Sequence, residues 1–142
     1  NKIKNIIEYS AYESMYLMEA EKIEVFHNDK KLSISDMNKK FNKIDKKFEI
    51  KYAVYEALRK KGHVPKTALK FGAEFRVYAK GSGPGKGHSK WIVYTESESS
   101  KNSWHEFSAK NRVAHSTNKK LLLAIVDDEK DVLFSEVSWI KI

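Results

Sequence analysis

The chain has 142 residues, 41% of them hydrophobic, which is enough for a core in one compact domain or two small subdomains. It contains no run of about 18 apolar residues and no secretory signal pattern, so we expect neither membrane insertion nor export and predict a soluble, cytoplasmic protein. The absence of cysteine excludes disulfides, thiolate nucleophiles and zinc ribbons, whereas the net charge of +8 favours a phosphate-rich partner such as nucleic acid.

The N-terminal part of the chain has the hydrophobic periodicity of helices. Apolar residues recur at three- and four-residue steps up to Ala20, which predicts an amphipathic helix carrying Ile3, Ile7, Ala11, Met15 and Met18. A short strand at 23–27 and a polar turn follow. Ser33 or Ser35 is predicted to cap a second helix that continues to Leu58, and Gly62 ends this helical part.

The pattern changes after Gly62 to short β-branched and aromatic runs broken by glycine. We therefore predict a boundary there, with an N-terminal α/β subdomain of residues 1–62 and a second domain of residues 63–142. In the second domain the pattern predicts a helix at 103–116, strands at 71–79, 89–95, 121–126 and 132–142, and a flexible glycine-rich loop at 80–87.

Three segments of the second domain stand out together. They are Lys70–Tyr78 (KFGAEFRVY), His88–Trp91 (HSKW) and Arg112–Leu122 (RVAHSTNKKLL). These segments resemble the catalytic domain of the archaeal and eukaryotic tRNA-splicing endonucleases. The similarity extends from about Ile34 to the C terminus, and the intervals of 10 residues from Tyr78 to His88 and 31 from His88 to Lys119 agree with the archaeal pattern.

The resemblance implies a catalytic triad of Tyr78, His88 and Lys119. It also implies the α/β (α+β) fold class, with a mixed-sheet catalytic domain of the restriction-endonuclease-like type that follows a small helical N-terminal subdomain. The strands that commonly precede the first helix in this family are absent from the sequence, so we expect the N-terminal subdomain to be incomplete.

The chemistry of these residue types fits RNA cleavage without a metal or another cofactor. Such a reaction needs a base near the 2′-hydroxyl, an acid near the departing 5′-oxygen, and positive charge near the phosphorane. His88 suits the acid. Tyr78 is a base only if positive charge favours its anion, and Lys119 supplies both that charge and transition-state stabilisation. The expected products are a 2′,3′-cyclic phosphate and a 5′-hydroxyl, and DNA is not a substrate because it lacks the attacking group.

Further basic residues are candidates for RNA contact. Arg112 lies seven residues before Lys119, where the family pattern has an arginine that stacks on a flipped base of the intron-exon bulge. Five others are predicted to bind backbone phosphates: Lys66, Lys70, Arg76, Lys86 and Lys90. Each of these residues also has an ordinary interpretation as a solvated surface charge.

An acidic turn interrupts the basic second domain at Asp127, Asp128, Glu129 and Asp131. In the resembling family an acidic loop at this position docks into a basic groove of a neighbouring subunit, although a solvated turn is the alternative. The apolar final strand would also pair with a second chain if its edge is exposed. The resemblance therefore implies an oligomer, either an (αβ)2 heterotetramer, a homotetramer or a dimer, that acts on the bulge-helix-bulge of precursor tRNA.

Two other functions deserve comparison. A noncatalytic RNA-binding or assembly subunit of the same complex would be expected to lack the triad. A metal-dependent DNA nuclease would need an acidic strand motif, and Glu49-Ile50-Lys51, which matches a Glu-x-Lys pattern, lies inside a predicted helix. The remaining histidines have no comparable context and are predicted to be structural: His27, His63, His105 and His115.

Overall fold

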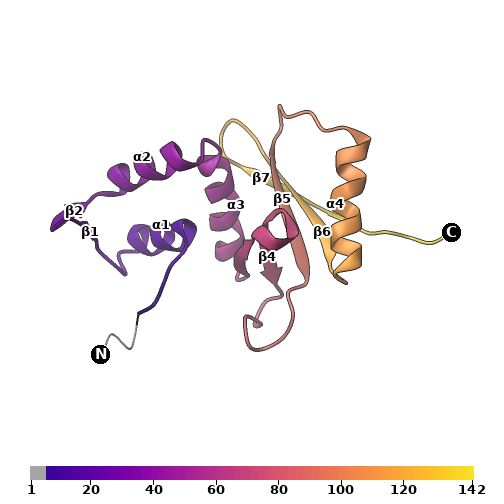
Figure 1. Ribbon diagram of the computed structural model, residues 1–142, viewed down its shortest axis with the longest axis horizontal. Helices are drawn as coiled ribbons and strands as arrows, with labels where there is room; N and C mark the ends of the chain where they lie inside the picture. Colours follow the sequence, from indigo (N-terminus) through magenta and orange to yellow (C-terminus); the bar gives the residue numbers. More distant parts are fainter. Residues whose placement is uncertain (1–5) are drawn as a thin grey trace. The chain divides into compact units, whose positions relative to one another are not determined.

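The structure is a computed structural model that describes residues 6–142 (Figure 1). The chain divides into two compact units, the first ending at Glu49 and the second beginning at Ile50. In this described part, no helix is long and apolar enough to cross a membrane. Helices and a mixed sheet together confirm the α/β (α+β) class expected from the sequence.

The first unit contains two helices and one hairpin. Its elements are α1 (Ala11–Glu19), β1 (Val25–His27), β2 (Lys30–Leu32) and α2 (Ile34–Ile44). The hairpin pairs His27 with Lys30, and both turn residues between them, Asn28 and Asp29, have positive φ. This is the geometry that two-residue hairpins prefer. Buried side chains form the unit's core: Met15, Met18, Leu32, Met37 and Phe48.

The first helix is shorter than its hydrophobic pattern predicts. Ile3 lies outside the described residues, and residues 6–10 are not helical, with Ile7 72% exposed. The helix begins after Ser10, whose side chain accepts a hydrogen bond from Glu13 N while the Glu13 carboxylate accepts one from Ser10 N. This reciprocal cap fixes the start of the helix, and the apolar periodicity before it was misleading.

The single long helix predicted from Ser33 to Leu58 is wrong. Ser33 caps α2, but α2 ends at Ile44 and α3 (Phe48–Lys60) starts separately. Asp45 has extended backbone angles, and its side chain accepts a hydrogen bond from Lys47 N. Aspartate competes for local backbone donors in this way, which interrupts a helix that the apolar spacing alone would continue.

The second unit includes most of α3, although the sequence-based boundary falls after it. Tyr55 of α3 is 1% exposed, and its ring centroid lies 5.9 Å from that of Phe75 in the sheet. Gly62 marks the end of α3, with φ of +90°. A division into residues 1–62 and 63–142 remains a prediction about folding units, whereas the compact units divide between Glu49 and Ile50.

The second unit is built around a five-stranded sheet in chain order. The strands are β3 (Val64–Ala68), β4 (Ala73–Tyr78), β5 (Trp91–Ser97), β6 (Lys120–Val126) and β7 (Val132–Val137). Only the β5–β6 pair is parallel, and α4 (Trp104–Ser116) connects these two strands. A parallel pair requires such a crossover, so the two strands begin at the same end of the sheet.

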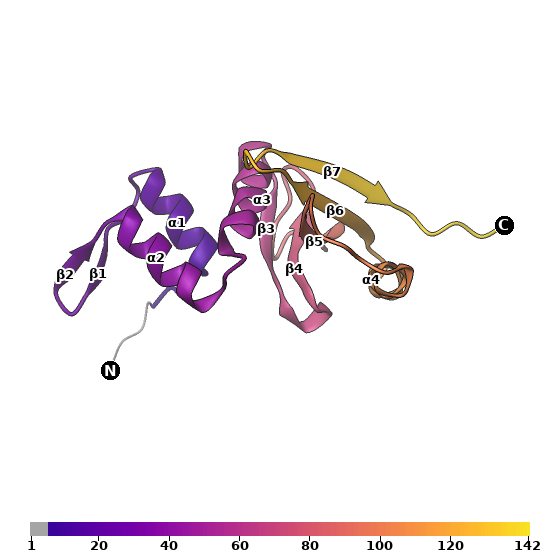
Figure 2. The same cartoon turned by 90° about the horizontal axis from the view of Figure 1, so that it is seen from above.

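Helices cover opposite faces of this sheet (Figure 2). Phe75 is paired with Val93 on the face that meets α3. Ile92, which points to the other face, is clustered with Ala114 of α4 and with Leu121. Each of these five side chains is at most 1% exposed. Burial on both sides explains why the interior strand β6 has a continuous apolar sequence.

Several strand limits differ from those predicted. The edge strand β3 was not predicted, because Pro65 cannot donate a ladder hydrogen bond and marks a strand only at a sheet edge. Gly72, with φ of +69°, ends a short 3₁₀ helix (η1, Leu69–Phe71) and delays the start of β4. β5 begins at Trp91, and the last strand ends at Val137, so residues 138–142 are not part of β7.

We predict that Leu121→Ala destabilises the second unit by about 2–5 kcal/mol, because Leu121 is fully buried between two strands and a helix. Urea unfolding measures this change. Leu69→Ala is the matched control, since Leu69 is 84% exposed and its truncation should change stability by no more than about 0.5 kcal/mol. Equal losses in both variants would contradict the assigned core.

Candidate functional site

Two backbone hydrogen bonds join the three segments singled out in the sequence. Lys90 N donates to Val77 O at 2.8 Å, and Lys120 N donates to Lys90 O at 3.0 Å. Tyr78 directly follows Val77, and Lys119 directly precedes Lys120. The end of β4 and the beginnings of β5 and β6 therefore meet at one end of the sheet.

Tyr78 and His88 flank the glycine-rich loop at this end. Tyr78 is the last residue of β4 and is only 6% exposed. The loop 79–87 turns through hydrogen bonds from Ser82 N to Ala79 O and from Lys86 N to Gly83 O, and it contains four of the protein's six glycines. His88 is exposed at the far end of the loop, immediately before the buried Ser89.

Lys119 reaches the segment that carries His88. Its Nζ donates a hydrogen bond to Ser89 O at 3.0 Å, and its side chain is half-buried. The ammonium group is thus fixed next to the Ser89–Lys90 peptide group, one residue beyond His88. This contact brings the lysine and histidine segments together across the start of β5.

The backbone of Lys119 is held by the end of α4. Asn118 adopts the left-handed conformation with φ of +59°, and its N–H donates to His115 O. Lys119 N donates to Ala114 O at 2.8 Å, which completes a Schellman motif. Carbonyl groups at a helix C terminus carry partial negative charge, so this end of α4 is a favourable location for the lysine ammonium.

A cavity of about 210 Å³ opens beside Lys119. Its walls come from the second half of α4, the start of β6, and the end of β7 with the residues after it. They include Asn111, His115, Lys119, Lys120, Val137, Ser138 and Trp139. The rings of His115 and Trp139 meet edge to face with centroids 4.0 Å apart. An aromatic wall with amide, imidazole and ammonium groups can accept a flat polar ligand next to a phosphate.

A comparison with protein families bears on this arrangement. Residues 48–134 match the model of the tRNA intron endonuclease catalytic C-terminal domain. The chain belongs to the tRNA intron endonuclease family. The matched range includes all three segments at the end of the sheet and confirms the resemblance found in the sequence.

Individual relatives support the same membership. The tRNA-splicing endonuclease of Nanoarchaeum equitans is 49% identical over 135 residues, which cover 91% of this chain and 86% of that protein. The proteins of the same name from Thermococcus onnurineus and Pyrococcus furiosus are 39% and 41% identical, each over 93% of this chain and 75% of the relative.

The basic residues predicted to contact RNA have different surroundings. Lys86 and Lys90 are exposed, and the Lys90 ammonium lies 4.5 Å from the centroid of the Trp91 ring. Arg112 is exposed on α4, next to Asn111 of the cavity wall. These three candidates are therefore accessible on the strands, loop and helix that bear the family segments.

The other predicted phosphate ligands lie along η1, β3 and β4. Lys70 has its ammonium 5.0 Å from the Phe71 ring centroid. Arg76 donates a hydrogen bond from Nη1 to Thr67 O, so its guanidinium stabilises the β3–β4 pair. Lys66 is paired with Arg76 in the register of these strands. Their known contacts are structural, and a role in RNA binding remains a prediction for each.

The acidic turn is held together by one of its own carboxylates. Asp127 Oδ1 accepts hydrogen bonds from Glu129 N and Asp131 N, both at 2.9 Å. Asp128, Glu129 and Asp131 are exposed. Three negative charges are therefore available on the surface, while the fourth shapes the turn.

Between residues 6 and 142, no group of three or more His, Asp or Glu side chains is arranged to bind a metal ion. Glu49 and Lys51 lie in α3, as the sequence predicted for that Glu-x-Lys pattern.

Two residues near Lys119 were not among the candidates identified from the sequence. His115 was predicted to be structural, yet it lines the cavity. The available signal was its four-residue spacing from both Asn111 and Lys119, which aligns Asn111 and His115 on one face of α4. Trp139 was assigned to a final strand, whereas it lies beyond β7 and packs on His115.

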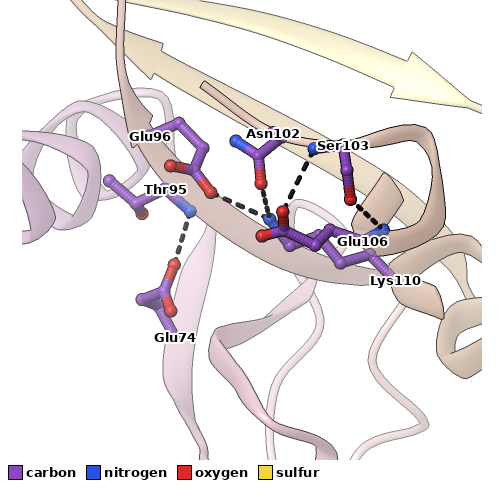
Figure 3. A network of polar contacts seen from close by, with 7 residues as sticks. All are labelled: Glu74, Thr95, Glu96, Asn102, Ser103, Glu106 and Lys110. Atoms are coloured by element: carbon purple, nitrogen blue, oxygen red, sulfur yellow. Dashed lines mark hydrogen bonds and ion pairs between the residues drawn. The ribbon is translucent and has the colours of Figure 1, made fainter. Parts of the chain in front are cut away.

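A second polar cluster lies where β5 leads into α4 (Figure 3). Lys110 Nζ contacts Glu96 Oε2 at 2.8 Å and Asn102 Oδ1 at 3.1 Å. The Glu74 carboxylate accepts a hydrogen bond from Thr95 N. Burial nevertheless raises the pKa of Glu74. The Lys110–Glu96 contact attaches the middle of α4 to β5, and the Glu74–Thr95 contact joins β4 to β5.

We predict that Glu74→Gln stabilises the protein at pH 7 and that this advantage disappears near pH 4. The raised pKa means that the folded state disfavours the carboxylate, so wild-type stability falls as pH rises from the unfolded pKa through the folded one. Thermal unfolding at several pH values measures the difference.

Glu106→Gln is the control for this experiment. Hydrogen bonds from Ser103 lower the pKa of Glu106, so its carboxylate contributes stability above the unfolded pKa, and this is lost as pH falls through the folded pKa. The control should therefore be less stable than wild type at pH 7. A shared direction in the two variants would refute this account.

Proposed function

We propose that this chain is the catalytic subunit of an endonuclease that removes introns from precursor tRNA at bulge-helix-bulge sites. The observation that carries the proposal is the meeting of the Tyr78, His88 and Lys119 segments at one end of the sheet. Family membership supports the same activity. The reaction transfers the phosphodiester to the neighbouring 2′-hydroxyl and leaves a 2′,3′-cyclic phosphate and a 5′-hydroxyl.

Each member of the triad has one role in this proposal. Tyr78 removes the proton of the attacking 2′-hydroxyl, and His88 donates a proton to the departing 5′-oxygen. Lys119 places positive charge near the phosphorane and next to the phenol. The exposure of His88 and the contact from Lys119 to Ser89 O support these assignments, because both groups lie along the same short segment.

The low exposure of Tyr78 adds one requirement. Tyr78 as a whole residue is only 6% exposed, so little of its surface is available to a ribose. Loop 79–87 follows Tyr78 directly, and its four glycines allow backbone rearrangement at low steric cost. We therefore assign the opening to this loop, on binding of the RNA.

RNA contact in the proposal uses the exposed cations around the site. Arg112 stacks on an unpaired base of the bulge, and the cavity beside Lys119 gives that base a place outside the helix. Lys86 and Lys90 bind backbone phosphates, which makes affinity depend on salt without reading sequence.

Assembly is part of the proposed activity, because two bulges require two active sites at a fixed separation. The exposed acidic residues Asp128, Glu129 and Asp131, on the turn shaped by Asp127, dock on a basic surface of the next subunit. The assembly is an (αβ)2 heterotetramer, a homotetramer or a dimer. Precursor tRNA as the substrate would place the reaction in the cytoplasm.

A noncatalytic assembly subunit is the alternative function. The residue types required for the reaction are all present at the end of the sheet, and no observation favours the alternative.

The purified chain should cut a bulge-helix-bulge RNA in EDTA and should fail on RNA with 2′-deoxyribose at the scissile position. His88→Ala should lower the cleavage rate at least about 100-fold, since general acid catalysis contributes about 10²–10⁴-fold, while RNA binding stays near wild type. Gel analysis of the products measures the rate, and His105→Ala, which changes an exposed histidine of α4, is the control. Full activity of His88→Ala would reject the assigned acid.

Neutralising the exposed acidic residues, by Asp128→Asn, Glu129→Gln and Asp131→Asn together, should shift the assembly toward smaller species. Asp127 is kept because its carboxylate holds the turn. Light scattering at low salt measures the mass. The control Glu8→Gln, Glu21→Gln and Asp29→Asn removes the same charge from exposed positions of the first unit and should leave the mass unchanged.

A further inference from the structure

His63 is attached by its backbone to the end of α3. His63 N donates to Leu58 O at 3.0 Å, and Gly62 N donates to Arg59 O at 3.0 Å. With Gly62 at φ of +90°, these bonds form a Schellman motif. Because α3 packs on the sheet through Tyr55, the end of α3 fixes the backbone position of His63.

The imidazole of His63 holds the peptide group that follows Tyr78. Nδ1 lies 3.0 Å from Tyr78 O, and because a carbonyl oxygen only accepts, Nδ1 carries the proton. On the other side of the same residue, Val77 O accepts from Lys90 N at 2.8 Å. The peptide groups before and after Tyr78 are thus held by β5 and by His63, and Tyr78 is also paired with Val64 of β3.

Trp91 holds the imidazole ring in place. The two rings meet edge to face with centroids 5.4 Å apart. The indole is fixed in turn, because its Nε1 donates to Glu136 Oε2 at 2.8 Å and the Lys90 ammonium lies 4.5 Å from its ring centroid. The hydrogen bond to Tyr78 O therefore has a rigid support that extends to the edge strand β7.

We propose that His63 is a positioning residue that fixes Tyr78 where it can deprotonate the attacking 2′-hydroxyl, an inference that rests on the proposed function. Tyr78 lies between a rigid strand and a loop with four glycines. A hydrogen bond at its carbonyl keeps loop movement from reaching the phenol. His63 itself touches no reacting atom, so its effect is on the rate of the chemical step and not on RNA affinity.

His63→Phe tests the donor while retaining an aromatic ring against Trp91. Under single-turnover conditions, it should lower the cleavage rate constant about 10- to 100-fold with an unchanged Kd for RNA, which is the range expected from misplacing a reacting group. His63→Asn keeps an N–H donor near the position of Nδ1 and should remain within about threefold of wild type. Thermal unfolding confirms that both variants are folded, and His63→Ala replaces His63→Phe if the latter is not.

An RNA with sulfur in place of the departing 5′-oxygen shows which side of the reaction is affected. Sulfur departs without protonation, so His88→Ala should regain activity on this RNA, whereas the defect of His63→Phe should persist because attack is still impaired. The proposal is supported if the defect of His63→Phe persists on the sulfur RNA and His63→Asn keeps activity close to wild type. A wild-type rate for His63→Phe, equal losses for Phe and Asn, or recovery of His63→Phe on the sulfur RNA would overturn it.

Failure of the His63 role can be distinguished from failure of the proposed function. If Tyr78→Phe and His88→Ala retain full activity on ordinary RNA, the proposed triad fails, and the role of His63 fails with it. If both lose activity while His63→Phe does not, only the positioning role is rejected.

Discussion

The chain of backbone hydrogen bonds from Val77 through Lys90 to Lys120 is the constraint on which the candidate site depends. It brings together the end of an antiparallel strand and the starts of two parallel strands, which are separated by a loop and by a whole helix in the sequence. The side chains next to these bonds are Tyr78 and Lys119. Their relative location is therefore set by the ladder of the sheet.

Both helices of the second unit end at this site in the same way. The Schellman motif after α3 sets the backbone position of His63, and the one after α4 sets that of Lys119. In each case the backbone N–H donates a hydrogen bond to a carbonyl in the last turn of the helix. Gly62 and Asn118 adopt the left-handed conformation that the motif requires. Because α3 and α4 cover opposite faces, the end of β4 receives one side-chain contact from a helix end, and the start of β5 receives another.

Much of this arrangement could be predicted because it depends on local sequence. The cap at Ser33, the helix from 104 to 116 and the apolar run of β6 follow from residue type and spacing. The break at Asp45 could not be predicted from periodicity, since a side chain competes there for backbone donors. The start of α1 was misjudged for a similar reason, because a reciprocal cap at Ser10 overrides the apolar repeat.

The candidate site, too, could be predicted from the sequence only in part. The spacing of Tyr78, His88 and Lys119 identified the segments that meet at the end of the sheet. His63 had no signal of its own, because its contacts with Tyr78 and Trp91 join residues 15 and 28 positions away. Side-chain contacts across a sheet depend on register, and register becomes known only when the strands are paired.

The parallel pairing of β5 with β6 has a consequence for biosynthesis. Lys119 reaches Ser89 only after α4 has crossed the sheet and β6 has docked, and such nonlocal parallel pairing is intrinsically slow. A nascent polypeptide that has emerged only as far as α4 carries the phenol and the imidazole but lacks the ammonium. The three segments of the candidate site therefore meet only late in synthesis, once β6 is available to pair with β5.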